Sequence, residues 1–321
     1  MKAVYQTKYG KSEVLQYGEQ NTPNIKPDEV LIDNHASSVN PRDWMIRSGR
    51  YQLQFLVPSF PLILGSDLAG DVIAVGAKVS GFKVGDRVFG MKNPSEGLAS
   101  YAEKVAVSER NIALIPEGLS YLDAGGIPLC SLTAWQALVD KAAIKAGMEV
   151  MVIGASGGVG SYGVQIAHAL GANVTAVCSA ASSEMVTELG ANKVIDYHHE
   201  DFTQSPESYD LIFDTIGRHS LSRCSKVLKS GGTYVSTVPS PKNLKAMATT
   251  KLASFFSAKN QKASVVMVKA SGTDLGKIAR LLASKEIKPV VDRVFPIQDV
   301  AKAHDYSRSL RAKGKIVLQI Q

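Results

Sequence analysis

Four glycines stand within the segment Gly154–Gly160, directly after the apolar run Val150–Ile153. Glycines at such a place let a buried strand bend tightly into a helix and let backbone N–H groups approach a ligand. The start of that helix carries a partial positive charge, which attracts a pyrophosphate. The pattern therefore predicts a dinucleotide-binding loop, whose expected pyrophosphate contacts are Ser156, Gly157, Gly158, Val159 and Gly160.

The end of the next predicted strand bears on the choice of dinucleotide. An acidic residue at that place accepts hydrogen bonds from the ribose of NADH. Here the strand ends at Cys178, and no acidic residue follows before Glu184. The sequence therefore favours NADPH, with Ser179 as the candidate to bind the 2′-phosphate. No basic residue lies in the segment Ala180–Ser183, so the predicted preference is modest.

The composition is that of a soluble globular protein with one large or two medium domains. The chain has 321 residues, of which 45% are apolar and 20% charged. No apolar stretch is long enough to span a bilayer, and residues 1–8 have no signal-peptide core. The three scattered cysteines form no C-x-x-C pair, which favours a reducing compartment. We therefore expect a cytoplasmic protein without a membrane partner.

The net charge of +7 is unevenly distributed, because no acidic residue lies between Asp214 and Asp274. Such a region attracts cofactor phosphates, an acidic partner or nucleic acid. Only Phe255-Phe256 forms an aromatic pair there, so a solvated face is favoured over a nucleic-acid site. The basic residues of this stretch are Arg218, Arg223, Lys226, Lys229, Lys242, Lys245, Lys251, Lys259, Lys262 and Lys269.

Two patterns of secondary structure follow one another along the chain. Up to Pro116, short strands such as Val30–Ile32 and Asp71–Gly76 alternate with turn residues, which predicts a β-rich, barrel-like domain. Asp123–Ala143 has the apolar spacing of one helix. Strands and helices then alternate, which predicts a parallel sheet covered by helices on both faces. The expected strands are Val150–Ile153, Val174–Cys178, Val194–Asp196, Leu211–Asp214, Thr233–Val238 and Val265–Val268.

The C-terminal segment, with strands at Val290–Val294 and Lys315–Ile320, is expected to return to the first domain. The predicted division is residues 1–123 with 270–321 for the β-rich domain, and 124–269 for the α/β domain. The cleft between them, beside the carboxyl ends of the parallel strands, is the default place for an active site.

The order of these elements and two phrases, Gly65–Gly70 and Gly81–Val88, resemble the medium-chain dehydrogenase/reductase superfamily. The most similar branch is that of the zinc-free quinone oxidoreductases and enone or alkenal reductases. The glycine loop followed by Gln165 resembles the phosphate loop of that branch, with departures at Met151 and His168. The resemblance implies a GroES-like β-rich catalytic domain, a Rossmann domain with a doubly wound parallel sheet, and a homodimer.

The residues that hold zinc in other branches are replaced here. Zinc-dependent relatives have a cysteine at the position of Asn40 and a His-Glu pair at Ser66 and Asp67. An amide and a hydroxyl are poor zinc ligands, and Cys130 alone cannot hold the ion. We therefore expect no metal site. Without zinc, alcohol oxidation is harder, whereas a quinone or an α,β-unsaturated carbonyl accepts hydride at carbon.

The resemblance also implies roles for single residues. Asn40 and Tyr51 line the site, where the Tyr51 hydroxyl donates to the developing enolate oxygen, positions a water, or only packs. A second tyrosine common in this loop is Met45 here. Asp67 is expected to orient neighbouring groups. The cofactor contacts implied are Thr133, which could instead start a helix, Tyr197, and, more weakly, Val238 and Lys313.

The function predicted is an NADPH-dependent reductase of quinones, enones or alkenals that needs no zinc. A zinc-free alcohol dehydrogenase is one alternative. Another is a non-catalytic NADPH-binding protein that uses the basic stretch as its interaction surface.

Overall fold

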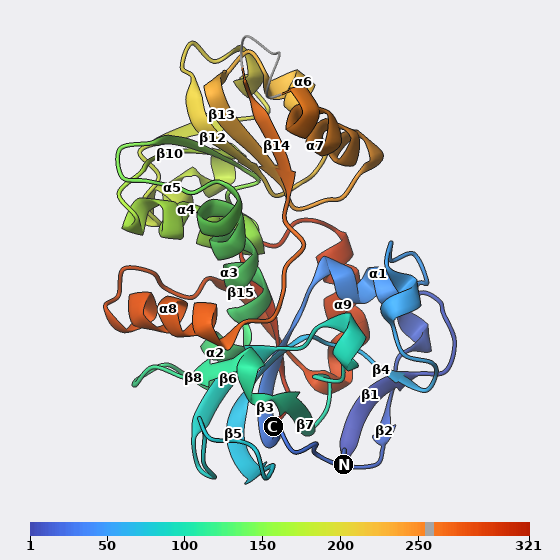
Figure 1. The fold of residues 1–321 in the computed structure, drawn as a ribbon. Coiled ribbons are helices and arrows are strands. Elements are labelled where there is room, and N and C mark those ends of the chain that lie inside the picture. Colours follow the sequence, from blue (N-terminus) through green and yellow to red (C-terminus); the bar gives the residue numbers. More distant parts are fainter. Residues whose placement is uncertain (254–259) are drawn as a thin grey trace. The chain divides into compact units, whose positions relative to one another are not determined.

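The computed structural model describes residues 1–253 and 260–321, which form two compact units (Figure 1). Unit 1 consists of Met1–Leu129 and Lys269–Gln321, and unit 2 of Cys130–Val268. The C-terminal segment thus returns to the first unit, as its strand pattern predicts. Among the described residues, no helix is long and apolar enough to cross a bilayer.

Unit 1 is built on two β-sheets and contains the GroES-like domain. A three-stranded sheet has the order β2 (Gln16–Glu19), β1 (Lys2–Gln6), β4 (Leu62–Ile63). In a larger sheet β7 (Lys104–Ser108) pairs with β3, and the other strands follow in the order β15 (Val291–Pro296), β16 (Lys315–Gln319), β3 (Glu29–Val39), β5 (Asp67–Val75), β6 (Arg87–Met91), β8 (Ile112–Leu114).

The four α-helices of unit 1 are α1 (Pro41–Arg47), α2 (Tyr121–Gly125), α8 (Gly272–Ala283) and α9 (Val300–Arg308). The predicted single helix over Asp123–Ala143 is wrong, because α2 ends at Gly125 and α3 (Pro128–Trp135) starts separately. Pro128 has no N–H to donate and disfavours helical geometry at the residue before it, so α2 does not continue into α3. A π-helical turn over Gln136–Lys141 completes the stretch.

Unit 2 contains the predicted doubly wound sheet, in which all strand pairs are parallel. The chain starts in the middle at β9, winds outward through β10 and β11, and then returns to the other side of β9. The helices besides α3 are α4 (Gly158–Ala169), α5 (Ser183–Glu188), α6 (Leu221–Cys224) and α7 (Pro241–Ala253). The strand order is β11 (Lys193–Asp196), β10 (Asn173–Cys178), β9 (Glu149–Ile153), β12 (Tyr209–Asp214), β13 (Leu228–Ser236), β14 (Lys262–Val265).

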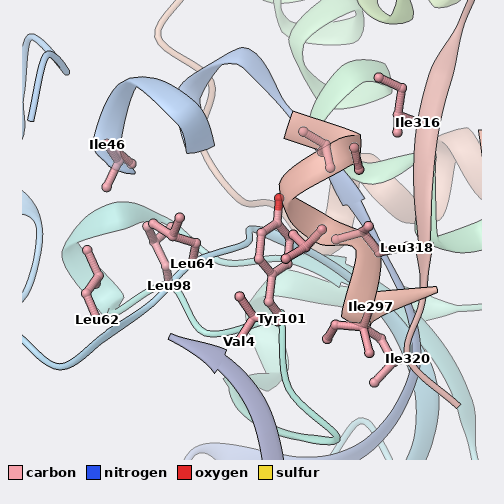
Figure 2. Close-up of a cluster of buried hydrophobic side chains, with 13 residues drawn as sticks. Val4, Ile46, Leu62, Leu64, Leu98, Tyr101, Ile297, Ile316, Leu318 and Ile320 are labelled. Carbon is pink, nitrogen blue, oxygen red and sulfur yellow. The ribbon is translucent and has the colours of Figure 1, made fainter. Parts of the chain in front are cut away.

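One apolar cluster of unit 1 holds together α1, α9, β1, β4 and β16. Figure 2 shows Tyr101 among these side chains, with Ile46 from α1 and Leu318 from β16 on different sides of it. Burying such side chains stabilises the fold by about 1.5–3 kcal/mol each. The buried members are Val4, Val39, Ile46, Leu62, Leu64, Leu98, Tyr101, Ile297, Val300, Ala303, Ile316, Leu318 and Ile320.

A chain of four polar side chains runs beside this cluster. The Tyr101 hydroxyl lies 3.1 Å from Asp43 Oδ2 and 3.2 Å from His304 Nε2. His304 Nδ1 lies 3.1 Å from an Nη atom of Arg47. Because a guanidinium only donates, Nδ1 must accept, and the proton of the neutral ring is on Nε2. Nε2–H therefore donates to Tyr101, and the Tyr101 O–H donates to Asp43.

Burial changes the pKa values of two members of this chain, Asp43 and His304. Burial raises the pKa of the Asp43 carboxyl to about 6, against the opposing charge of Arg42. Burial lowers the pKa of His304 to about 3, and the neighbouring Arg47 charge adds to this effect. The two groups therefore contribute opposite pH dependences to stability. Between about pH 4 and 6, native Asp43 retains a proton that the unfolded chain loses, whereas unfolded His304 binds a proton that the native state excludes.

We expect Asp43→Asn to leave His304 as the member of this pair that makes the free energy of unfolding depend on pH. Asp43 lowers the free energy of unfolding as pH rises from about 4 to 6, because the native state binds the extra proton. In Asp43→Asn, the free energy of unfolding should therefore rise with pH more steeply than in the wild type, by up to about 1.4 kcal/mol per pH unit. Urea unfolding at about pH 4.5 and about pH 5.5 measures the difference. His304→Gln should change the slope in the opposite direction, and equal slopes in all three proteins would contradict the assignment.

Candidate active site and cofactor loop

The glycines at the two ends of the β9–α4 loop are required by the fold itself. Gly154 has φ +76°, and a Cβ there would lie 2.6 Å from Ile216 Cδ1. A Cβ on Gly160 would lie 2.1 Å from the carbonyl oxygen of Gly154. The first glycine therefore makes the tight turn, and the last lets α4 pack closely against it.

The middle of the loop has room and donors for an anion. Gly157 is the N-cap of α4, and a Cβ there would approach protein only at 3.5 Å, so packing alone does not require glycine. The N–H groups of Gly158 and Val159 lie in the first turn of α4, where no acceptor exists within the helix. Ser156 is half-buried beside them. These features fit a pyrophosphate at the N-terminus of α4.

Two predicted cofactor residues lie together at the carboxyl ends of β10 and β11. Ser179 directly follows β10, and Tyr197 directly follows β11. The strands pair Cys178 with Asp196, and the Tyr197 N–H donates to the Cys178 carbonyl at 3.2 Å. Tyr197 is 53% exposed, so its ring offers a surface to a ligand at this edge.

The remaining predicted cofactor residues are spread over both units. Thr133 lies within α3 of unit 2 and is almost fully buried. Val238 follows β13 in the same unit, where its carbonyl accepts from the amide of Asn243 at 3.1 Å. Lys313 is exposed and belongs to unit 1, two residues before β16.

Asn40 occupies the junction between β3 and α1, and its side chain is fully buried. Its Nδ2 donates to Asp67 Oδ2 at 2.9 Å, and its Oδ1 accepts from Lys315 Nζ at 2.7 Å. Its backbone N–H donates to Asp43 Oδ2 at 2.8 Å. Lys315 escapes prediction from the sequence, because 275 positions separate it from Asn40 and no motif marks it.

The Asp67 carboxylate collects donors from several segments of unit 1. Oδ2 accepts from the Ser38 hydroxyl at 2.5 Å as well as from Asn40, and Oδ1 accepts from the Leu129 N–H at 2.7 Å. Lys315 Nζ lies 3.6 Å from Oδ2. A carboxylate with these partners orients the groups around it.

Tyr51 lies three residues after Ser48, the C-cap of α1, and packs against the apolar cluster of Figure 2 while half-buried. No hydrogen bond of its hydroxyl is found within residues 1–253 and 260–321. Its location leaves open both a packing role and donation to a ligand.

Asn40 and Ser66, at positions that hold zinc in other branches, each have a cationic neighbour here. The Asn40 amide is bonded to the Lys315 ammonium, and the Ser66 hydroxyl accepts from an Nη atom of Arg42 at 2.5 Å. An amide, a hydroxyl and two neighbouring positive charges do not fit a zinc ion. The described part of the chain contains no group of three or more His, Cys, Asp or Glu side chains arranged to hold a metal.

Most of the basic stretch is exposed where the structure describes it. Lys229 pairs with Asp210 at 2.8 Å, and the other described members are exposed: Arg218, Arg223, Lys226, Lys242, Lys245, Lys262 and Lys269. The side chain of Lys251, the Phe255-Phe256 pair and Lys259 lie outside the described side chains. This exposure fits the solvated face favoured by the sequence.

Two protein-family models match segments of this chain, and together the segments reach into both units. Residues 26–117 match the model described as an alcohol dehydrogenase GroES-like domain, and residues 189–318 match the model described as a zinc-binding dehydrogenase. Asn40 and Ser66 lie in the first of these two segments, outside the one matched by the zinc-binding model.

Whole-length relatives give a finer comparison. The chain is 34% identical to 2-methylene-furan-3-one reductase of Solanum lycopersicum over 332 residues, covering 99% of this chain and 79% of the relative. It is also 34% identical to the chloroplastic NADPH-dependent alkenal/one oxidoreductase of Arabidopsis thaliana over 330 residues, with the same coverage. The solved quinone oxidoreductase of Coxiella burnetii superposes with a TM-score of 0.90 at 28% identity, covering 100% of this chain and 99% of that one. The chain belongs to the medium-chain dehydrogenase/reductase superfamily, in its quinone and enone reductase branch.

Proposed function

We propose that this protein is an NADPH-dependent reductase that transfers hydride to a quinone or to the C=C bond of an enone or alkenal, without zinc. The observation that carries the proposal is the hydrogen-bonded Asn40–Lys315–Asp67 group, in which Asn40 stands where the resemblance puts a cysteine in zinc-dependent relatives. The names of the similar proteins, an enone reductase, an alkenal reductase and a quinone oxidoreductase, support the same class of acceptor.

NADPH would be held mainly by the β9–α4 loop and the ends of β10 and β11. The first-turn N–H groups of α4 would bind the pyrophosphate, and Ser179 and Tyr197 would lie at the adenosine ribose. Thr133, Val238 and Lys313 are further candidates. When bound, the cofactor supplies the hydride.

The protein's own residues would bind the acceptor and stabilise the charge that develops on its oxygen. Asn40 is fully buried and is held rigidly by hydrogen bonds to Asp43, Asp67 and Lys315, so it would keep the β3–α1 junction of the site in one geometry. The Tyr51 hydroxyl, or a water that it positions, would donate to the enolate oxygen. The proton that completes the reduction reaches the substrate from that donor or from solvent.

Steady-state oxidation of NADPH with quinones, enones and alkenals of graded size tests this proposal. Turnover with at least one of these classes is expected. NADPH binding without turnover would favour the non-catalytic alternative. Reduction of NADP⁺ by simple alcohols, without turnover of enones or quinones, would favour a zinc-free alcohol dehydrogenase.

We also propose a cytoplasmic homodimer. The dimer is supported by the family resemblance alone, and the reducing compartment by three buried cysteines outside disulfides, Cys130, Cys178 and Cys224. Sedimentation of the purified protein and fractionation of cells test the two statements separately. Nucleic-acid binding is not part of the proposal.

Activity should not require a metal. The ammonium and guanidinium groups near Asn40 and Ser66 oppose a divalent cation, so the purified protein should contain much less than one zinc per chain. Elemental analysis and turnover after treatment with a chelator check this. Stoichiometric zinc, with activity lost to the chelator and restored by zinc, would refute metal independence.

Tyr51→Phe should lower kcat and leave the KM for NADPH nearly unchanged. A hydroxyl that donates to the developing oxyanion acts in the transition state, and losing such a donor costs about 100- to 1,000-fold in kcat. Tyr17→Phe, at an exposed position on β2, is the matched control. Equal kinetics of the two variants with several acceptors would assign Tyr51 to packing.

Ser179→Asp should move the cofactor preference toward NADH. An aspartate would repel the 2′-phosphate but accept hydrogen bonds from a free ribose. Two like charges near contact cost about 1–4 kcal/mol, so the ratio of kcat/KM for NADPH and NADH should fall by roughly one to three decades. Ser230→Asp, which adds the same charge at an exposed position in β13, is the matched control. A ratio changed equally by both variants would show that Ser179 does not face the ribose.

A further inference from the structure

The backbone fixes the position from which the Lys315 side chain starts. Lys315 is the first residue of β16, and its N–H donates to the Val290 carbonyl at 2.8 Å. Gly314, with φ +101°, precedes it, and a Cβ there would lie 2.4 Å from the same carbonyl. The glycine thus permits the close approach that sets the lysine in place.

The ammonium of Lys315 is buried in unit 1. Its side chain is 3% exposed, and the carboxylate of Asp67, at 3.6 Å, is fully buried. An ammonium taken out of water is costly unless an anion and hydrogen-bond acceptors compensate it. Asp67 supplies the anion, and Asn40 Oδ1 supplies an acceptor at 2.7 Å.

The two charges dictate which way the Asn40 amide faces. An ammonium only donates hydrogen bonds, and a carboxylate only accepts them. Oδ1 must therefore face Lys315 and Nδ2 must face Asp67, as their distances of 2.7 and 2.9 Å require. A flipped amide would put Nδ2 against the ammonium and Oδ1 against the carboxylate, which is repulsive at both contacts.

We propose that Lys315 is a positioning residue of the reductase site, which acts by locking the Asn40 amide between its ammonium and the Asp67 carboxylate. The role at catalysis rests on the proposed function, whereas the locked amide does not.

The test compares Lys315→Met with Asn40→Ala and with the double variant. Methionine keeps the length and apolar stem of lysine without the charge. A misplaced positioning group costs up to about 100-fold in rate, so Lys315→Met should lower kcat by roughly 10- to 100-fold with little change in the KM for NADPH. Because Lys315 acts through Asn40, adding Lys315→Met to Asn40→Ala should lower kcat little further. Lys302→Met, at an exposed position on α9, is the control that should leave kcat unchanged.

A second variant guards against a failure to fold. Lys315→Met leaves the Asp67 charge buried without its cation, which is destabilising. Asp67→Asn combined with Lys315→Met removes both charges, so this protein should fold while keeping the low kcat. Wild-type kcat in either folded variant would overturn the proposal, as would fully additive losses from Lys315→Met and Asn40→Ala.

A spectroscopic readout separates this inference from the proposed function. The NMR signals of the Asn40 side-chain amide report its hydrogen bonds directly. They are assigned by their absence from the spectrum of Asn40→Ala. In Lys315→Met these signals should shift and their exchange with solvent should accelerate, whether or not the protein turns over any acceptor. Unchanged signals would overturn the lock itself. A wild-type protein without turnover would overturn only the proposed function.

Discussion

The buried carboxylate of Asp67 is the constraint on which the candidate site depends. A negative charge without solvent must be met by donors, and here they arrive from Ser38, Asn40, Leu129 and Lys315. Ser38 lies on β3 and Asn40 directly follows it, Leu129 ends the N-terminal part of unit 1, and Lys315 starts β16 near the C-terminus. Unit 1 can satisfy this charge only when its N-terminal and C-terminal segments have assembled. The chemistry of the site is therefore tied to completion of the fold.

The apolar cluster around Tyr101 makes that assembly favourable (Figure 2). It draws β16 and α9 from the C-terminal segment against β1, β4 and α1 from the N-terminal one. The polar chain from Arg47 to Asp43 then restricts how α1 and α9 can meet, because each group has one acceptable donor or acceptor arrangement. Apolar burial supplies the free energy, and the polar contacts select one geometry from those that burial alone would allow.

The cofactor loop of unit 2 has a different origin. Its geometry follows from local sterics: Gly154 makes the turn, Gly160 admits the helix, and Gly157 is left open toward a ligand. Each of these properties belongs to a short segment and its adjacent strand. One unit thus carries a site encoded within seven residues, and the other a site assembled from residues up to 275 positions apart.

The sequence by itself determined the β-rich and doubly wound domains, the glycine-rich turn between β9 and α4, the place of Ser179 after its strand, and the presence of an amide and a hydroxyl at Asn40 and Ser66. These features depend on local periodicity, on glycines and on residue type. The continuous helix over Asp123–Ala143 was a wrong prediction, because apolar spacing outweighed the proline signal. Only the tertiary structure decided that Lys315 meets Asn40. Such a contact depends on which strands become neighbours, and that is fixed by packing across the whole unit and by the need to neutralise a buried charge.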